Sequence, residues 1–391
     1  MILQRRVLRR GAWAGTGKGS GGRAVKRLFE RLRSWLRPHP VVTTETSDVP
    51  PGPRRGPMDL VVVLDGTMGH LRDPLGHTNA GRAFLLLREQ VPGRRRALYY
   101  EPGLQWEGWR KTLDVMQGRG INRQIRRAYG WLACHYRPGD RIYLLGYSRG
   151  AFAVRSLAGV IDRVGLLRAD AATERHVQLA YRHYERDPER PAARAFARRH
   201  CHANTPIEMV GVWDTVKALG LRLPLLWMLT EGRHAFHNHQ LGKHIRHGFH
   251  ALALDETRSV FAPVLWECGA EDDGCWKGNV EQVWFRGSHG DVGGQLAGYE
   301  AARPLANIPL VWMLERAEAT GLTLPTGWPA RFPCDPEAPP LGNWHGWGAL
   351  FVLRRRRIVG RDRSERLHPT AIRPDPTGWR ARLPFGRPQR L

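Results

Sequence analysis

The chain has few cysteines and no long apolar run. It contains five cysteines among 391 residues, an odd number at irregular spacing and without a C-x-x-C pair. This usage argues against a disulfide framework or a zinc module and suits a reducing compartment with free thiols, although Cys268 and Cys275 could pair under oxidising conditions. The longest apolar candidate, residues 221–230, is shorter than the roughly 18 residues of a membrane span and contains Pro224. No membrane-spanning helix is therefore predicted.

The N-terminus lacks the pattern of a secretory signal. Residues 1–22 mix arginine with glycine and serine, and no apolar middle region follows the charged start. Nothing in this stretch predicts a cleaved leader.

Acidic residues are too few to balance the basic ones, and most of the excess positive charge lies at the two ends of the chain. The formal net charge is +25. Residues 1–57 carry thirteen Lys and Arg against three acids, and residues 352–391 carry twelve against three. The middle of the chain is only mildly basic, so the charge concerns the tails and their partners rather than the fold.

Residues 1–57 are predicted to be a basic segment outside the folded domain. Within it, residues 24–37 place Val, Leu, Phe and Trp on one helical face and Lys and Arg on the rest. Such a basic amphipathic helix could lie on an anionic membrane surface or in the groove of a partner, or it could dock on the protein's own domain, and these alternatives stay open. Residues 38–57 are rich in proline and predict a linker.

A single folded domain is predicted over residues 58–325. Two stretches, near 170–205 and 221–250, are predicted insertions, and the first is polar, basic and helix-prone. Residues 326–391 are rich in Arg, Pro and Trp, show no clear periodicity and are predicted to be an irregular C-terminal segment.

Apolar runs and helical periodicity alternate along this domain. The predicted strands are residues 60–64, 97–101, 142–145, 206–214, 261–268 and 280–285. The predicted helices are residues 83–90, 118–136, 151–161, 249–258 and 308–320. This alternation predicts an α/β fold, like that of an α/β-hydrolase, with a mostly parallel, doubly wound sheet and helical insertions.

The pentapeptide Gly146-Tyr147-Ser148-Arg149-Gly150 lies between a predicted strand and a predicted helix. Strand, G-x-S-x-G and helix together form the context of a nucleophile elbow. Because the turn is tight, Gly146 and Gly150 are needed where a Cβ would meet the neighbouring backbone. The hydroxyl of Ser148 would then project from the turn at a helix N-terminus, which favours a developing negative charge.

An elbow serine needs a base and an acid, and three strand ends supply this set. Ser148, Asp214 and His289 each close an apolar run, so they are expected at one edge of the sheet in the order Ser, acid, His. Asp291 is a competing acid and His368 a competing base. Asp214 could instead cap a helix that begins at the following residues.

The oxyanion hole of such a site consists of two backbone N–H groups. One is expected from Arg149, directly after the nucleophile. The other is expected from Gly66 or Thr67, in the loop after the first central strand. Asp65 could hydrogen-bond this loop into shape or only cap the turn.

Histidines are concentrated in residues 221–250. The six are His234, His237, His239, His244, His247 and His250. Their spacing defines no ligand set and no carboxylate lies among them, so no metal and no other cofactor is predicted.

Several blocks together resemble the DUF2235 family, an α/β-hydrolase group that includes Tle1-type phospholipase effectors of type VI secretion. These blocks are VVVLDGT, LGYSRGAFAVRSLAG, GVWDTVKALG, HALALDETRSVFAPVLW, QVWFRGSHGDVGG and NIPLVWMLERA, in family order from about residue 58 to about 322. The resemblance implies esterase or phospholipase A activity without a metal. It places the nucleophile on Ser148, the acid on Asp214 and the base on His289. Met68 and Gly69 stand where family members usually have an aromatic residue and an asparagine, so this loop is expected to differ in shape.

The sequence thus predicts a serine esterase or lipase that cleaves carboxylic esters of phospholipids through an acyl-enzyme. There are two alternatives: a hydrolase-like protein that binds without catalysis, and a nucleic-acid-associated protein that acts through its arginine-rich tails. Nucleic acid is the less favoured partner, because the domain lacks an aromatic and basic binding motif. We expect a cytoplasmic protein that could contact anionic membranes through residues 24–37. Export of the protein as an effector is an open alternative. The sequence does not identify an immunity or secretion partner.

Overall fold

The protein is described here by a computed structural model. The described residues are 42–46, 56–89, 91, 93, 95–103, 119–216, 241–268, 279–343 and 353–372. They all belong to the compact unit Pro40–Leu391, which is distinct from the unit Met1–His39. The predicted helix at 24–37 and the first three histidines of the 221–250 stretch lie outside the described residues.

One eight-stranded sheet organises the domain, with the strand order β1-β3-β2-β4-β5-β6-β7-β8. The strands are β1 (Val42–Thr46), β2 (Asp59–Leu64), β3 (Arg96–Glu101), β4 (Arg141–Tyr147), β5 (Ile207–Trp213), β6 (Ile245–Ala253), β7 (Val280–Phe285) and β8 (Glu365–Leu367). Only the β1–β3 pair among them is antiparallel. The predicted mostly parallel α/β sheet is confirmed.

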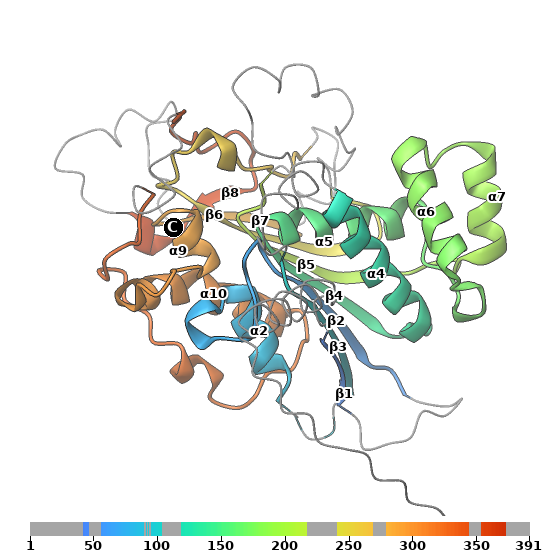
Figure 1. Cartoon of the computed structure of the whole chain (residues 1–391), viewed down its shortest axis with the longest axis horizontal. Helices are drawn as coiled ribbons and strands as arrows, with labels where there is room; N and C mark the ends of the chain where they lie inside the picture. The colour runs from blue at the N-terminus through green and yellow to red at the C-terminus, as the bar shows by residue number, and fades with distance from the viewer. Residues whose placement is uncertain are drawn as a thin grey trace, which may run out of the picture. The chain divides into compact units, whose positions relative to one another are not determined.

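Helices cover both faces of this sheet. The α-helices among the described residues are α2 (Asn79–Leu87), α4 (Arg119–His135), α5 (Arg149–Arg163), α6 (Glu174–Arg186), α7 (Pro191–His200), α9 (His289–Gly293) and α10 (Arg303–Ala319). Figure 1 shows α4 and α5 on one side of the sheet and α2 and α10 on the other. Along β2, Leu60 and Val62 enter the core with α4 and α5, whereas Val61 and Val63 enter the core with α2 and α10. Both faces of the strand are buried, which explains its continuous apolar run.

The strand order reverses beside β2. The chain passes from β2 to β3 on one side and then crosses to β4 on the other side. The carboxyl ends of β2 and β4 therefore flank a topological switch point, where open α/β sheets bind their ligands. The loop that starts at Asp65 and the turn at Ser148 lie at these two ends.

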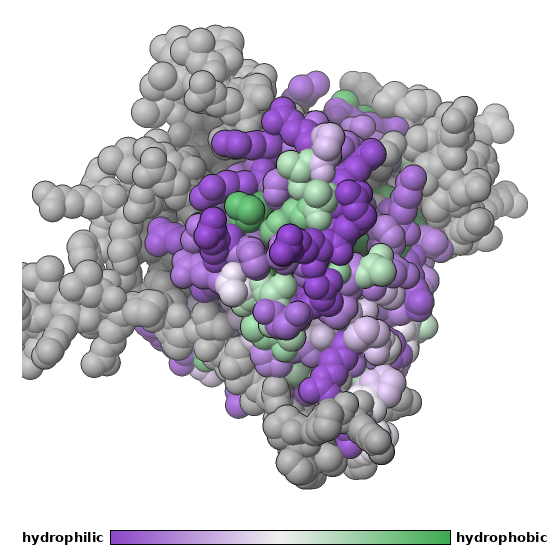
Figure 2. Space-filling view, turned by 90° about the vertical axis from the view of Figure 1, so that its right-hand side faces the viewer, coloured by the Kyte–Doolittle hydropathy of each residue, from purple (hydrophilic) through white to green (hydrophobic). Residues whose placement is uncertain are grey.

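The predicted insertion at 170–205 forms α6 and α7. Tyr181 and Tyr184 of α6 and Phe196 of α7 join the core that also contains α4 and α5. Figure 2 shows the side of the molecule on which these two helices lie in Figure 1, and its surface is mostly hydrophilic around a smaller hydrophobic strip. The arginine-rich sequence of this stretch thus matches a helical layer at the surface.

Two predicted elements differ in the structure. Residues 249–258, predicted as a helix, contain the end of β6, which lies between β5 and β7 with both faces buried, so that no period-2 alternation marks it as a strand. Residues 261–268, predicted as a strand, begin at the last residue of the short 3-10 helix η5 (Ser259–Phe261). Within the described part of the chain, their one bridge joins Pro263 to Val216. Proline has no amide proton for a ladder, which explains why no strand continues there.

The C-terminal segment adds an edge strand to the sheet. β8 pairs in parallel with β7, with Gln282 opposite Glu365 and Trp284 opposite Leu367. A strand of three residues is too short for a periodicity to show in the sequence. Part of the segment predicted as irregular therefore belongs to the sheet.

The cysteines differ in their chemistry. Cys134, Cys201 and Cys334 are free thiols, but Cys268 is disulfide-bonded. The prediction of a free thiol is wrong for Cys268, because pairing depends on the separation of two side chains in space, which sequence spacing does not give. Cysteine usage therefore no longer indicates a reducing compartment.

Within the described residues, no helix has both the length and the apolar character that crossing a membrane requires.

Candidate active site

The turn between β4 and α5 is sharp and leaves no room for side chains on its glycines. Ser148 has φ 56° and ψ −118°, and α5 begins directly after it. A Cβ on Gly146 would lie 2.6 Å from the carbonyl oxygen of Gly150, and one on Gly150 would lie 2.1 Å from the carbonyl oxygen of Leu64. Glycine is therefore required at both positions by close backbone approach.

Three strand ends bring Ser148, His289 and Asp214 into one hydrogen-bonded array. The Nε2 atom of His289 lies 2.9 Å from the Ser148 hydroxyl, and its Nδ1 atom lies 2.6 Å from Oδ2 of Asp214. A carboxylate only accepts, so Nδ1 carries the proton and Nε2 is left to accept from the serine. The three residues are buried, with exposed fractions of 6%, 5% and 0% for Ser148, His289 and Asp214.

Arg357 binds the far side of the Asp214 carboxylate. Its Nη1 lies 2.5 Å from Oδ1 and its Nη2 lies 2.9 Å from Oδ2. The amide of Ala253 also donates to Oδ1, at 3.0 Å. Burial alone would raise the pKa of Asp214, but the charge of Arg357 and the hydrogen bonds from His289 and Arg357 outweigh it and hold this pKa well below its usual range. Asp214 is therefore ionised.

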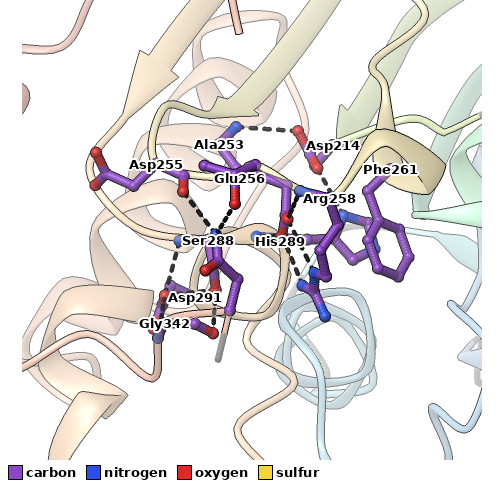
Figure 3. Close-up of polar contacts among 12 residues, drawn as sticks. Asp214, Ala253, Asp255, Glu256, Arg258, Phe261, Ser288, His289, Asp291 and Gly342 are labelled. Carbon is purple, nitrogen blue, oxygen red and sulfur yellow. Dashed lines mark hydrogen bonds and ion pairs between the residues drawn. The ribbon is translucent and has the colours of Figure 1, made fainter. Parts of the chain in front are cut away.

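Two aromatic rings and an acidic side chain hold His289. Phe261 stacks on its imidazole with centroids 4.6 Å apart, and the ring of Tyr147 lies 5.0 Å away. Glu256 accepts the backbone N–H of His289 at 3.1 Å and is itself paired with Arg258. Figure 3 shows Asp214, Glu256 and Arg258 arranged around His289, with Phe261 beside them. The imidazole is thus fixed by contacts to its ring and to its backbone.

The two alternative residues have other partners. Asp291 caps α9, where its carboxylate accepts from the amide and hydroxyl of Ser288 and from the amide of Leu341. His368 stacks on Phe285 and shares a hydrogen bond with Thr370. The structure therefore joins neither of them to the serine array.

Asp65 organises the loop on the opposite side of Ser148. Its carboxylate accepts from the Gly66 amide at 2.7 Å, the Thr78 hydroxyl at 2.7 Å and the Tyr100 hydroxyl at 2.6 Å. Burial raises the pKa of Asp65, and the hydrogen bonds oppose this shift. Because the Gly66 amide donates to Asp65, it is not available to an oxyanion. Of the two residues predicted to supply the second oxyanion-hole amide, Thr67 is therefore the remaining candidate.

Thr67 is held in place through its carbonyl group. The side-chain amide of Gln295 donates to this carbonyl at 2.8 Å, while the hydroxyl of Tyr147 lies 3.4 Å from the side-chain oxygen of Gln295. In the part of the chain that the structure describes, the Thr67 amide has no hydrogen-bond partner. Its buried hydroxyl has none either. Met68, the next residue, has φ 65° and is 45% exposed.

The described histidines of the 221–250 stretch make other contacts. His244 pairs with Asp162, His247 stacks on Phe249, and Nε2 of His250 accepts the amide of Thr215. Burial is the main cause that lowers the pKa of His250 to about 3. Among the described residues there is no group of three or more His, Cys, Asp or Glu suited to a metal.

The sheet with its elbow and the Ser–His–Asp array define an α/β-hydrolase-like domain. Residues 58–316 match the family described as "T6SS, Phospholipase effector Tle1-like, catalytic domain". The chain belongs to this family.

Other proteins share parts of the chain. An uncharacterized protein of Saccharomyces cerevisiae is 28% identical over 232 residues, which are 52% of this chain and 32% of the yeast protein. A crystal structure of an uncharacterized protein from Pseudomonas aeruginosa has 18% identity and a TM-score of 0.44, over 75% of this chain and 51% of that one. A Tle1 effector bound to the VgrG spike of the type 6 secretion system has 16% identity and a TM-score of 0.34, over 65% and 57%. The chain thus spans a third of the yeast relative and about half of each solved chain.

Three residues of the site, Arg357, Glu256 and Phe261, are not predicted from the sequence. Arg357 is one of four consecutive arginines, so nothing in the local pattern distinguishes it from its neighbours. Glu256 and Phe261 lie in a block quoted for the family resemblance, and this was the one available signal for them.

Proposed function

We propose that the protein is a serine esterase that cleaves carboxylic esters of phospholipids through an acyl-enzyme. The observation that carries this proposal is the continuous hydrogen-bonded array from Ser148 through His289 to the ionised Asp214, buried at the switch point of the sheet. This array supplies a nucleophile, a base with its free nitrogen on the nucleophile, and an anion that orients the base.

In the first step the Ser148 oxygen attacks the ester carbonyl carbon. Nε2 of His289 takes the hydroxyl proton, and the resulting imidazolium is stabilised by Asp214 through Nδ1. His289 then gives this proton to the leaving alcohol, and the acyl group stays on Ser148. In the second step His289 takes a proton from a water molecule, whose oxygen attacks the acyl carbon. The bond from this carbon to the Ser148 oxygen then breaks, His289 returns the proton to Ser148, and the fatty acid leaves.

The negative charge of the tetrahedral intermediate requires donors beside Ser148. The amide of Arg149 opens α5, so it has no earlier turn of the helix to bond. Thr67 offers its amide and its hydroxyl, neither of which is engaged by the described residues. Gln295 and Asp65 fix the loop that carries Thr67 before substrate arrives, as preorganised stabilisation requires.

Family membership favours phospholipids as the esters. The basic residues in 24–37 and at the C-terminus would bring the enzyme to an anionic bilayer, each charge near the surface adding about 1 kcal/mol. For the delivery of the enzyme, we propose export through a type VI secretion system with a spike protein as partner.

The test compares wild type with Ser148→Ala on a panel of phospholipids, with products identified by mass spectrometry. We expect wild type to release fatty acid and lysophospholipid, and Ser148→Ala to release neither. Ser156→Ala changes a buried serine on the same helix and serves as the matched control, with activity retained. A fluorophosphonate probe should label wild type and the control but not Ser148→Ala. Folded wild type that takes no label and cleaves no ester would establish the binding-protein alternative instead.

A further inference from the structure

Arg357 is built into the array but comes from outside the matched family region. It lies in the described C-terminal residues 353–372, beyond the family match at 58–316. Its side chain is 4% exposed and faces an Asp214 side chain that is fully buried. Two guanidinium nitrogens bind two carboxylate oxygens, which is the bidentate geometry that fixes both groups in orientation.

The same guanidinium also bonds the segments on either side of the array. Nη1 donates to the carbonyl of Ala253 at 2.8 Å, at the end of β6. Nη2 donates to the carbonyl of Phe261, the residue whose ring stacks on His289. Arg357 thus connects the acid, the strand beside it and the aromatic residue that holds the base.

Backbone contacts hold the segment that delivers Arg357. The amide of Ser259 donates to the carbonyl of Leu353 at 3.0 Å, and the amide of Arg355 donates to the carbonyl of Thr257 at 2.6 Å. Residues 353–355 therefore run beside residues 257–259, directly before the turn that carries Phe261. These backbone hydrogen bonds hold the segment that carries Arg357 in place beside residues 257–259.

Several charged or titratable groups surround the Asp214–His289 pair. They are Tyr147, His250, Glu256, Arg258, Asp291 and Arg357. Glu256 and Arg258 pair with each other, and Asp291 is engaged by the cap of α9. Arg357 is the cation in direct contact with Asp214, at hydrogen-bond distance from both oxygens.

We propose that Arg357 is a positioning residue, which fixes the orientation of the Asp214 carboxylate and opposes the addition of a proton to the hydrogen-bonded pair that Asp214 forms with His289. This inference rests on the proposed function. A neighbouring cation disfavours the addition of a proton to the pair, whichever partner would take it, because the added charge is repelled in either case. A C-terminal segment outside the matched family region therefore tunes the pH range of the reaction.

The experiment separates the charge of Arg357 from its geometry. The pH profile of kcat/KM is measured on a soluble short-chain ester for wild type, Arg357→Met, Arg357→Lys and Arg355→Met. Arg357→Met should move the acid limb of the profile to higher pH by about one unit or more. Arg357→Lys keeps the charge but loses the fork, so its acid limb should stay near that of wild type while kcat falls. Arg355→Met, which removes an exposed neighbouring charge, should leave both unchanged.

An unchanged acid limb in Arg357→Met overturns the proposal, because a purely structural loss would lower kcat/KM equally at every pH. If Arg357→Met does not fold, Arg357→Gln supplies the same comparison, since it is also neutral but keeps a polar side chain. The failure of the proposed function is distinguished by wild type itself, which would then cleave no ester and take no fluorophosphonate label.

Discussion

The ring of Phe261 stacks on the imidazole of His289, with centroids 4.6 Å apart and planes inclined by 18°. The guanidinium of Arg258 lies 4.3 Å from the centroid of the Phe261 ring. Arg258 in turn pairs with Glu256, which accepts the backbone N–H of His289. Side chains from the segment 256–261 therefore orient the proposed base both through its ring and through its backbone.

Loss of this stacking should slow the chemistry and not weaken binding. We expect Phe261→Ala to lower kcat by roughly 2- to 10-fold, the equivalent of an aromatic pair worth about 0.5–1.5 kcal/mol. Phe261→Tyr keeps the ring and should retain most of the activity. Steady-state kinetics on a small ester give kcat and KM separately. A raised KM with unchanged kcat would show that Phe261 contacts substrate instead.

The close approach at Gly150 predicts a large loss of stability for any side chain there. A Cβ would lie 2.1 Å from the carbonyl oxygen of Leu64, which is backbone and cannot rotate away. Gly150→Ala should therefore lower the free energy of unfolding by on the order of 3 kcal/mol. Urea unfolding followed by circular dichroism measures this change.

Gly130→Ala is the matched control for this substitution. Gly130 lies in α4, and a Cβ there would be 3.7 Å from the nearest atom, an ordinary contact with Val177. Alanine is the better helix former by up to about 1 kcal/mol, so the control should be at least as stable as wild type. Equal losses in the two variants would contradict the steric argument.

The buried His250 should make the fold sensitive to acid. Burial is the largest cause that lowers its pKa from 6.5 to about 3 in the folded protein. The unfolded chain therefore binds this proton first, so stability falls as the pH drops below 6.5 and continues to fall until about pH 3. Each pH unit in this window costs up to about 1.4 kcal/mol from this group.

Unfolding free energies measured at neutral pH and at about pH 5 test this contribution. We expect wild type to lose more stability between the two than His250→Gln, in which the side chain does not titrate. His244, which is exposed and paired with Asp162, provides the control substitution His244→Gln. If the two variants lose stability equally with pH, His250 does not govern the acid sensitivity.

Strand ends made much of this fold and the serine array predictable from sequence. Ser148, Asp214 and His289 each follow an apolar run, and parallel strands bring their carboxyl ends to one edge, so distant residues meet there. The glycines of the elbow follow from the same turn geometry. That these three residues catalyse ester cleavage is a proposal, which the variants above test.

The rest depended on the path of the chain in space. Arg357 could not be distinguished from the arginines before it, because its ion pair with Asp214 spans 143 residues. The sequence of β6 does not alternate between apolar and polar residues, because the end of this strand is buried on both faces, and it is therefore predicted as a helix. The hydrogen bond from the Gly66 amide to Asp65 could not be predicted either. It belongs to a network in which Thr78 and Tyr100 also donate to the Asp65 carboxylate, and their positions are known only from the fold.

The backbone of Ser148 predicts a difference between two inactive variants. Its φ of 56° lies in the region that favours glycine, and holding a side chain there costs about 1–3 kcal/mol. Ser148→Gly relieves this strain, and the extra freedom that glycine gives the unfolded chain offsets about 0.5–1 kcal/mol of the gain. Ser148→Ala keeps the Cβ and the strain, and both variants lose the hydrogen bond to His289.

Ser148→Gly should therefore be the more stable of the two by about 1 kcal/mol, while both fail to cleave esters. Urea midpoints at equal unfolding slopes give this comparison directly. A glycine variant less stable than the alanine variant would mean that the folded protein does not hold Ser148 under strain. The predicted order would show that the folded protein holds a strained residue at the position whose hydroxyl lies 2.9 Å from Nε2 of His289.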